Sequence, residues 1–425
     1  MVTLMSRLDE LLATVEGYRD AMIEEMTTML RIPAMGPENG GEGEFDRARF
    51  IEGLVRRCGF QEVETYESLD DRVKMKVRPS VIARRRGKSK RTIWFISHMD
   101  TVSPGDAKAW TYPPFDGTVA DGKLYGRGSE DNGQAIISTL FALRSMMTIE
   151  EEPAYTIGAA VVADEEAGSD HGIKFLIEKG LFGEDDIFYV PDAGVPDGSV
   201  IEVAEKSIIW LKFRVRGKQV HASTPERGLN ALRIGSEMMV ELSEHLYGKF
   251  SARDQLFSPQ ASTFEPTKRL ANVDNVKTVP GEDIFYMDIR LLPQYDVQDC
   301  IDTAKSIAAM FEERSGATIE VTVERVDPAG KASSANGDGA IALRKAIRRI
   351  RGIEPTLTGI GGQTCANWFR QAGMEAYVWE TCDETAHQVD EYVRIDNLVD
   401  DAKVYATLLA DLCYPGRFKG PCPDY

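Results

Sequence analysis

The motif HMD places a histidine and a carboxylate two residues apart, one serine after the apolar run 93–96. Alternation along a strand sends the side chains of His98 and Asp100 to one face. A metal-bound imidazole usually donates its other ring N–H to a carboxylate, so this pair has the composition of a metal ligand and the group that orients it. A buried histidine bonded to a nearby aspartate, without a metal, is the alternative.

The motif DEEAGSD follows the apolar run 157–163 and contains two adjacent glutamates. Glu165 and Glu166 must point in different directions, so one can bind a cation while the other faces the water that this cation polarises. Neighbouring carboxylates are costly to bring together unless cations neutralise them, which favours a metal site. A solvated acidic loop is the alternative.

The segment GRGSEDNG holds Asp131 in a glycine-rich loop, before a helix that we expect to begin near Gln134. Gly126, Gly128 and Gly133 permit tight turns that can direct this carboxylate inward. The alternative is a helix N-cap, a position where aspartate is favoured. The segment is not a dinucleotide-binding fingerprint, because a third glycine is missing at the required spacing.

Two further residues complete a set of metal ligands. Asp192 follows the apolar run 187–190 in PDAG, and His387 lies far along the chain in ETAHQVDEY. Two zinc-like ions need one bridging carboxylate, with one histidine and one more carboxylate for each ion, and a position left for water. The residues that can supply this set are His98, Asp131, Glu166, Asp192 and His387.

The elements that must position these residues alternate between helical patterns and short apolar runs up to about residue 206. This alternation predicts an α/β fold with a mixed, mostly parallel sheet flanked by helices. The three runs 93–96, 157–163 and 187–190 each lead into a polar cluster. Because sites in open α/β sheets lie at the carboxyl ends of the strands, we expect one shared site.

The pattern changes at residue 207, where apolar and basic residues alternate over 211–216 as in a half-exposed strand. A helix over 230–246 and strands over 284–289 and 319–326 give a β-α-β-β order. We therefore predict a small α+β domain at 207–327, inserted into a discontinuous catalytic domain made of 1–206 and 328–425.

The composition of the chain excludes some classes of binding partner. A chain of 425 residues with a net charge of -18 is too long for one core and too acidic for a nucleic-acid or anionic-membrane surface. The basic segment 84–91 is interpreted as a solvated hairpin turn rather than a binding patch. A small molecule or short peptide is the expected partner.

The lack of a signal-peptide pattern and the spacing of the cysteines favour the cytoplasm. The first residues show helical spacing (Leu4, Leu8, Leu11, Leu12 and Val15) instead of a signal-peptide pattern, and no run approaches the roughly 18 apolar residues of a membrane span. The six cysteines are scattered without paired spacing, which suits a reducing compartment.

These motifs resemble those of the M20 metallopeptidase family, which includes aminoacylases, acetylornithine deacetylase, succinyl-diaminopimelate desuccinylase and glutamate carboxypeptidases. The resemblance runs in order through HMDTV, GRGSEDNG, DEEAGS, PDAG, GKQVHASTPERGLNA, DIRLLP and the late histidine. It implies a two-metal amide-bond hydrolase with a phosphorylase/hydrolase-like catalytic domain. The inserted domain would be ferredoxin-like and would act as a lid or in dimerisation.

The resemblance also implies a role for each residue of the set. His98 and Asp192 would hold one ion, Glu166 and His387 the other, and Asp131 would bridge them. Glu165 would be the general base and then acid, while Asp100 would orient His98. The ions are expected to be zinc, with cobalt or manganese as alternatives, since similar ligand sets accept several divalent ions.

Residues of the inserted domain are implied in substrate binding. His221 in VHAS would stabilise the oxyanion, commonly in the partner subunit's site of a homodimer, and Arg290 in DIR would contact a substrate carboxylate. The alternatives are that His221 caps a strand end and that Arg290 pairs with a nearby acid. Three residues of the motif GIGGQTCAN can approach a ligand closely, namely Gly361, Gly362 and Thr364.

Two departures from the family pattern bear on the substrate. Lys277 stands where many relatives have asparagine, and Cys365 stands where many have aspartate. Lys277 and Arg290 offer carboxylate partners, so we favour deacylation of an N-acyl amino acid, of the deacetylase or desuccinylase type. A di- or carboxypeptidase of the same family is the first alternative. A noncatalytic metal-binding dimer is the alternative from another class.

Overall fold

The computed structural model describes residues 6–418, so Leu4 and Cys422 lie outside the described part. The chain forms two compact units. The larger unit consists of 1–203, 332–357 and 364–425, and the smaller unit consists of 204–331 and 358–363. Each unit is described by itself.

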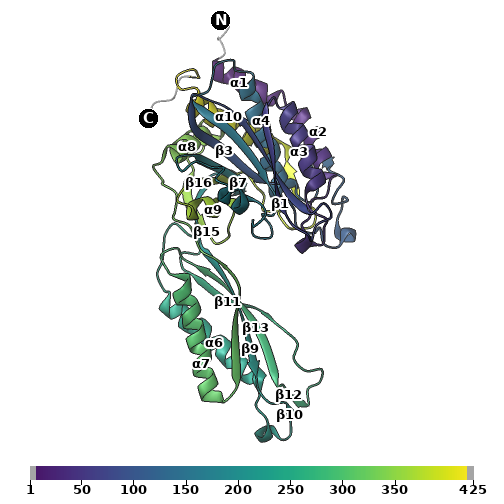
Figure 1. Cartoon of the computed structure of the whole chain (residues 1–425), viewed down its shortest axis with the longest axis vertical. Helices are drawn as coiled ribbons and strands as arrows, with labels where there is room; N and C mark the ends of the chain where they lie inside the picture. Colours follow the sequence, from purple (N-terminus) through teal and green to yellow (C-terminus); the bar gives the residue numbers. More distant parts are fainter. Residues whose placement is uncertain (1–5, 419–425) are drawn as a thin grey trace. The chain divides into compact units, whose positions relative to one another are not determined.

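An eight-stranded sheet forms the centre of the larger unit (Figure 1). Its strands, in spatial order, are β1 (Glu62–Leu69), β2 (Val77–Arg85), β6 (Tyr155–Val162), β3 (Ser89–His98), β7 (Ile187–Gly194), β16 (Glu375–Glu380), β8 (Val200–Glu205) and β15 (Thr356–Ile360). The four central strands β6, β3, β7 and β16 run parallel, whereas β2 is antiparallel to both β1 and β6, and β8 is antiparallel to β16. The predicted mixed α/β sheet is thereby confirmed.

Helices cover this sheet on both faces (Figure 1). They are α1 (Arg7–Glu16), α2 (Arg19–Leu30), α3 (Phe45–Arg57), α4 (Gln134–Met147), α5 (Ile173–Glu178), α8 (Asp338–Arg351), α9 (Cys365–Gln371) and α10 (Ile395–Cys413). Neighbouring residues of β3 point to opposite layers: the Phe95 ring lies 5.2 Å from that of Tyr405 in α10, and the Trp94 ring lies 5.2 Å from that of Phe182. Burial on both faces explains why residues 93–96 of β3 form a continuous apolar run.

A small three-stranded sheet accompanies the larger one. It orders β17 (Tyr392–Arg394), β5 (Lys123–Tyr125) and β4 (Thr118–Ala120). Residues 392 and 125 face each other in the β17–β5 pairing, so this sheet joins the segment that precedes Asp131 to the segment that follows His387.

The smaller unit has a four-stranded antiparallel sheet in the order β11-β13-β9-β14, with two long helices. Its elements are β9 (Ser207–Arg216), β10 (Val220–His221), α6 (Ala231–Lys249), β11 (Thr263–Arg269), β12 (Thr278–Val279), β13 (Glu282–Leu291), α7 (Val297–Ser315) and β14 (Thr318–Asp327). The order is β-α-β-β-α-β, so the β-α-β-β prediction lacked β11 and α7. The edge strand β11 is polar and mostly exposed, and it therefore gives no apolar signal.

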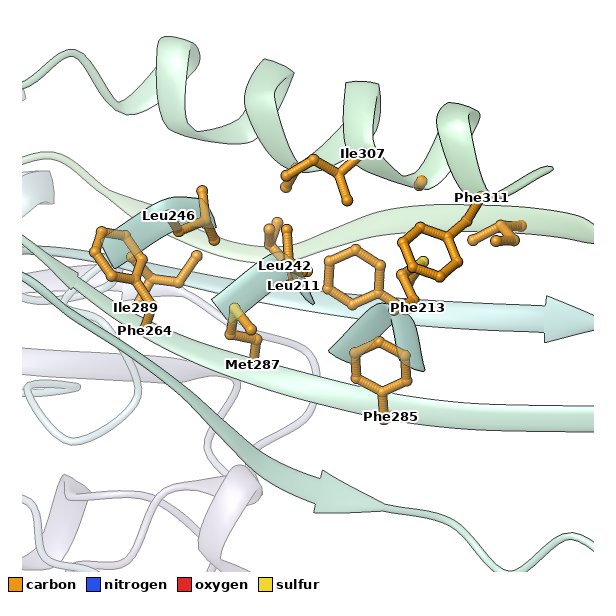
Figure 2. Close-up of a cluster of buried hydrophobic side chains, with 14 of the residues drawn as sticks. Leu211, Phe213, Leu242, Leu246, Phe264, Phe285, Met287, Ile289, Ile307 and Phe311 are labelled. Atoms are coloured by element: carbon orange, nitrogen blue, oxygen red, sulfur yellow. The ribbon is translucent and has the colours of Figure 1, made fainter. Parts of the chain in front are cut away.

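Figure 2 shows the core of the smaller unit, where the inward residues of β9 and β13 meet α6 and α7. Phe213 and Phe285 are fully buried, and their rings stack at 4.8 Å with an interplanar angle of 11°. Strand β9 buries alternate residues, as the period of two predicts. The cluster consists of residues 209–319 only, so the smaller unit has a core of its own.

The prediction of a hairpin at 84–91 is wrong. Strands β2 and β3 flank this turn, but they do not pair, because β6 lies between them. Arg86 pairs with Glu62 at the exposed end of this region, so the turn itself is solvated. A local sequence pattern cannot reveal that a strand from residues 155–162 enters between two strands that follow each other in the chain.

Two further expectations concern the described residues 6–418. None of their helices is long and apolar enough to cross a membrane. The five cysteines in this part (Cys58, Cys300, Cys365, Cys382 and Cys413) are free thiols.

Candidate active site

Four adjacent parallel strands of the larger unit end at one edge of the sheet, and each brings a predicted residue there. His98 is the last residue of β3, and the two glutamates 165 and 166 follow β6. Asp192 lies near the end of β7, and His387 lies in the loop after β16. Because parallel strands share their carboxyl edge, side chains far apart in sequence meet there.

Asp131 reaches the same edge from the loop before α4. Gly128 adopts a left-handed conformation with φ of 82°, which glycine accepts without strain. A Cβ on Gly133 would lie 2.4 Å from the carbonyl oxygen of Gly128, so the turn also needs the small residue there. The N-cap of α4 is Gly133, so Asp131 is not the N-cap, and that alternative is wrong.

The carboxylate of Asp131 lies between the two histidines. Its Oδ1 is 2.8 Å from Nε2 of His98, and its Oδ2 is 3.0 Å from Nε2 of His387. Each oxygen thus faces a different imidazole. This is the arrangement that a carboxylate bridging two cations requires.

Two groups of side chains around Asp131 could each hold a metal ion. One consists of His98, Glu165 and Asp192, and the other of Asp131, Glu166 and His387, with the ligand atoms in each group within 4.8 Å of one another. Asp192 lies 3.3 Å from His98, and Glu166 lies 3.2 Å from His387. The donors are imidazole nitrogens and carboxylate oxygens, which suit zinc and related ions.

Asp100 contacts both His98 and the loop that carries Glu165 and Glu166. Its backbone carbonyl lies 3.1 Å from Nδ1 of His98, and its carboxylate lies 3.5 Å from the same atom. The carboxylate also accepts the backbone N–H groups of Glu165 and Glu166, each at 3.1 Å. Asp100 therefore fastens the glutamate loop to the end of β3, a role that its sequence position did not reveal.

The electrostatics of the site show a surplus of buried negative charge. Burial and the charge of Asp192 raise the pKa of Glu165 well above its usual value, and burial with Asp131 raises the pKa of Glu166 to about 7. Hydrogen bonds to Asp131 and Glu166 raise the pKa of His387 to about 10. Divalent cations would neutralise this surplus, so the residues present fit a pair of them.

Three residues that were not predicted from the sequence support the site. Asn132 accepts the backbone N–H of His98 at 3.2 Å and donates to Asp192 Oδ1 at 2.9 Å. Glu391 accepts backbone N–H groups of the loop that carries Asp131, and Glu130 accepts backbone N–H groups of the loop that carries His387. Two of the three flank Asp131 directly, and this adjacency was the available signal.

The smaller unit contains most of the residues implied in substrate binding. His221 and Lys277 are exposed, and His221 Nδ1 lies 2.8 Å from the Ser223 hydroxyl. Arg290 pairs with Asp288 at 2.8 Å and donates to the carbonyl of Gly361 at 2.9 Å, so the predicted alternative of an acidic neighbour is present.

The two other residues of the glycine loop fall in different units. Gly362 is half-buried in the smaller unit. Thr364 belongs to the larger unit, where it caps α9 by accepting the N–H of Ala366 at 3.1 Å.

Comparison with known proteins assigns the chain to a family. The sequence profile described as peptidase family M20/M25/M40 matches residues 94–411. An uncharacterized metallohydrolase of Methanococcus maripaludis is 33% identical over 422 residues, which cover 93% of this chain and 100% of that protein. Succinyl-diaminopimelate desuccinylase of Paracoccus denitrificans is 26% identical over 340 residues, 78% of this chain and 86% of that enzyme.

A solved structure shares the fold. Human carnosine dipeptidase 1 superposes with a TM-score of 0.75 at 17% identity, covering 96% of this chain and 99% of that structure. The profile match extends over most of the chain, and the M. maripaludis relative matches over its whole length. The chain is therefore a metallohydrolase that belongs to peptidase family M20/M25/M40.

Proposed function

We propose that this chain hydrolyses the amide bond of an N-acyl amino acid at a centre of two divalent cations. The observation that carries the proposal is the position of Asp131, with one carboxylate oxygen 2.8 Å from His98 and the other 3.0 Å from His387. His98 and Asp192 would hold one cation and Glu166 and His387 the other, while Asp131 would bridge them.

Zinc is the proposed ion, and cobalt or manganese could replace it, because nitrogen and oxygen ligands of this kind accept several divalent ions. Bound there, the cations would polarise the scissile carbonyl and lower the pKa of a water molecule between them. The four partly buried carboxylates around two imidazoles support two cations rather than one.

Glu165 is the proposed general base. It takes a proton from the attacking water and then gives it to the nitrogen of the leaving amine. Its neighbourhood supports this role, because its backbone N–H is held by Asp100 and burial raises the pKa of its carboxyl group. A raised pKa lets a carboxylate hold the proton between the two steps.

The relatives and the residues of the smaller unit support the choice of substrate class. The desuccinylase of P. denitrificans supports a deacylase, whereas the dipeptidase fold of the human enzyme supports the peptidase alternative. Lys277 and Arg290 would bind a substrate carboxylate, with Gly361, Gly362 and Thr364 close to it. His221 would stabilise the oxyanion, and the smaller unit would serve as a lid and as the contact of a homodimer.

Release of free amine from a mixed panel tests the proposal. Metal-stripped protein is given N-acetyl and N-succinyl amino acids and dipeptides, with and without zinc, cobalt or manganese. Metal-restored cleavage of the N-acyl compounds supports the deacylase, and cleavage of dipeptides alone supports the peptidase. Two bound cations without turnover on any compound would favour a noncatalytic metal-binding protein.

Two variants separate the roles of the adjacent glutamates. Glu165→Gln is expected to bind two cations and lose nearly all turnover, whereas Glu166→Gln is expected to lose one cation. Glu178→Gln, at the end of α5, changes an exposed carboxyl group and serves as the control. Full activity of Glu165→Gln would remove this residue from the mechanism, and loss of a cation would make it a ligand.

A further inference from the structure

Two buried carboxylates near the site take no part in the proposed chemistry. The residue exposures of Glu130 and Glu391 are 3% and 0%, and neither belongs to the two groups that could hold a metal. A buried carboxylate is costly unless hydrogen bonds satisfy its oxygens. The partners of these two carboxylates therefore indicate what they do.

Glu391 binds the loop that carries Asp131. Its Oε1 accepts the backbone N–H groups of Glu130 at 3.0 Å and of Asp131 at 3.1 Å. Its Oε2 accepts the N–H of Gly128 at 3.1 Å and pairs with the Arg127 guanidinium. Both oxygens are thus used on residues 127–131, about 260 positions earlier in the chain.

Glu130 binds the loop that carries His387. Its Oε1 accepts the N–H of Asp383 at 2.5 Å, and its Oε2 accepts the N–H of Ala386 at 2.9 Å. The hydroxyl of Thr385 donates to the same Oε2 at 2.9 Å, and the backbone N–H of Thr385 donates there as well. The residue next to Asp131 therefore holds the residue next to His387.

The loop of His387 needs such a restraint. Glu384, His387 and Asp390 all adopt left-handed backbone conformations, with φ of 60°, 64° and 61°. Non-glycine residues hold this conformation only where their surroundings impose it. The His387 side chain is also 52% exposed, so packing around the ring does little to fix its position.

We propose that Glu130 and Glu391 form a reciprocal clasp that presets the distance between Asp131 and His387, and so determines the affinity of the cation site made by Asp131, Glu166 and His387. Each glutamate acts as a positioning residue through the backbone of the other's segment. The inference rests on the proposed function only in that this site binds a cation.

Metal binding tests the clasp without recourse to turnover. Metal-stripped wild type, Glu130→Gln and Glu391→Gln are titrated with Co²⁺ by calorimetry and visible absorption. His387→Ala identifies which of the two binding events belongs to its site. In both glutamine variants that event is expected to weaken by about 10- to 100-fold, since loss of supporting hydrogen bonds typically has this effect, while the other event, which shares only Asp131 with this site, weakens by less.

Asp186→Asn is the matched control. Asp186 is 7% exposed and accepts the backbone N–H of Thr92 at 2.7 Å, near the start of β3 and away from the ligands. This variant should leave both events unchanged. If Glu391→Gln does not fold, Thr385→Val replaces it, because it removes one donor to Glu130 and keeps both carboxylates; a weakening of several-fold is expected.

The possible results separate the clasp from the proposed function. Equal weakening of both events in the glutamine variants, or no weakening of either, overturns the clasp. A wild type that binds fewer than two Co²⁺ ions overturns the proposed cation pair instead. High Co²⁺ should also return the visible spectrum of the variants to that of the wild type, because the ligands themselves are intact; a spectrum that stays altered at saturation counts against a positioning role.

Discussion

Replacing Arg78 with methionine should strongly destabilise the larger unit. The Arg78 side chain is fully buried in β2, paired with the equally buried Glu44 at the start of α3. Its Nη1 also lies 3.0 Å from the carboxylate of Asp164, in the loop that leads to Glu165. Methionine fills much of the same space, so the change removes the charge and leaves two buried carboxylates without their cation.

The expected magnitude follows from that burial. Breaking a buried ion pair by removing one partner costs about 3–5 kcal/mol, because the remaining charge is desolvated and unpaired. Arg86→Met is the control, since Arg86 lies one residue beyond β2 and its pair with Glu62 is exposed on both sides. An exposed pair contributes about 0–1 kcal/mol, so the control should be close to wild type.

Urea unfolding followed by tryptophan fluorescence measures the difference. Of the five tryptophans only Trp210 lies in the smaller unit, so the signal reports mainly on the larger one. Adding Glu44→Gln to Arg78→Met should recover about 1–3 kcal/mol, because it removes one of the unpaired charges. A single variant within about 1 kcal/mol of Arg86→Met, or a double variant no more stable than the single one, would refute the reasoning.

Three other predictions concern cations, the smaller unit and pH. Zn²⁺ at about 100 times its dissociation constant should stabilise the larger unit by about 2.7 kcal/mol, and a melting temperature independent of Zn²⁺ would contradict the cation sites. Phe213→Ala should destabilise the smaller unit by about 3–5 kcal/mol in unfolding followed by circular dichroism, while Val326→Ala, at an exposed position, should cost under about 1. Burial raises the pKa of Asp401 from 3.8 to about 7, so the folded state binds its proton more tightly and stability falls as pH rises between these values. Asp401→Asn should remove about 4 kcal/mol of that fall, and an equal pH dependence in both proteins would exclude Asp401 as its source.

The proposed ligand residues could be identified in the sequence because chemistry restricts their types and the fold restricts their places. Histidines and carboxylates that follow apolar runs lie at strand ends, and parallel strands bring those ends together. His98, Glu166 and Asp192 were found in this way. His387 was proposed as the second histidine of the set, but its place at this edge could not be derived from a strand end, since the short strand β16 before it was not recognised in the sequence.

Pairing between distant segments could not be predicted in the same way. The turn at 84–91 has the local pattern of a hairpin, yet β6 enters between its two strands. Nearly all residues of edge strand β11 are polar and exposed. No alternation of apolar and polar residues therefore distinguishes it from a loop. Both errors arise because strand order is determined by contacts across the sheet, which no short window of sequence contains.

The support of the site has the same long-range character, and this affects how its residues should be interpreted. Next to Asp131, Glu130 has the appearance of one more acid in a solvated loop, but its carboxylate is buried and holds a segment some 250 residues away. Its partner Glu391 lies four positions after His387, a proposed ligand, and binds back to residues 127–131. A substitution at either position would change none of the proposed ligands, yet in the proposed clasp Asp131 and His387 depend on these two glutamates for position. Affinity for the second cation should therefore follow these two glutamates as closely as it follows the ligands themselves.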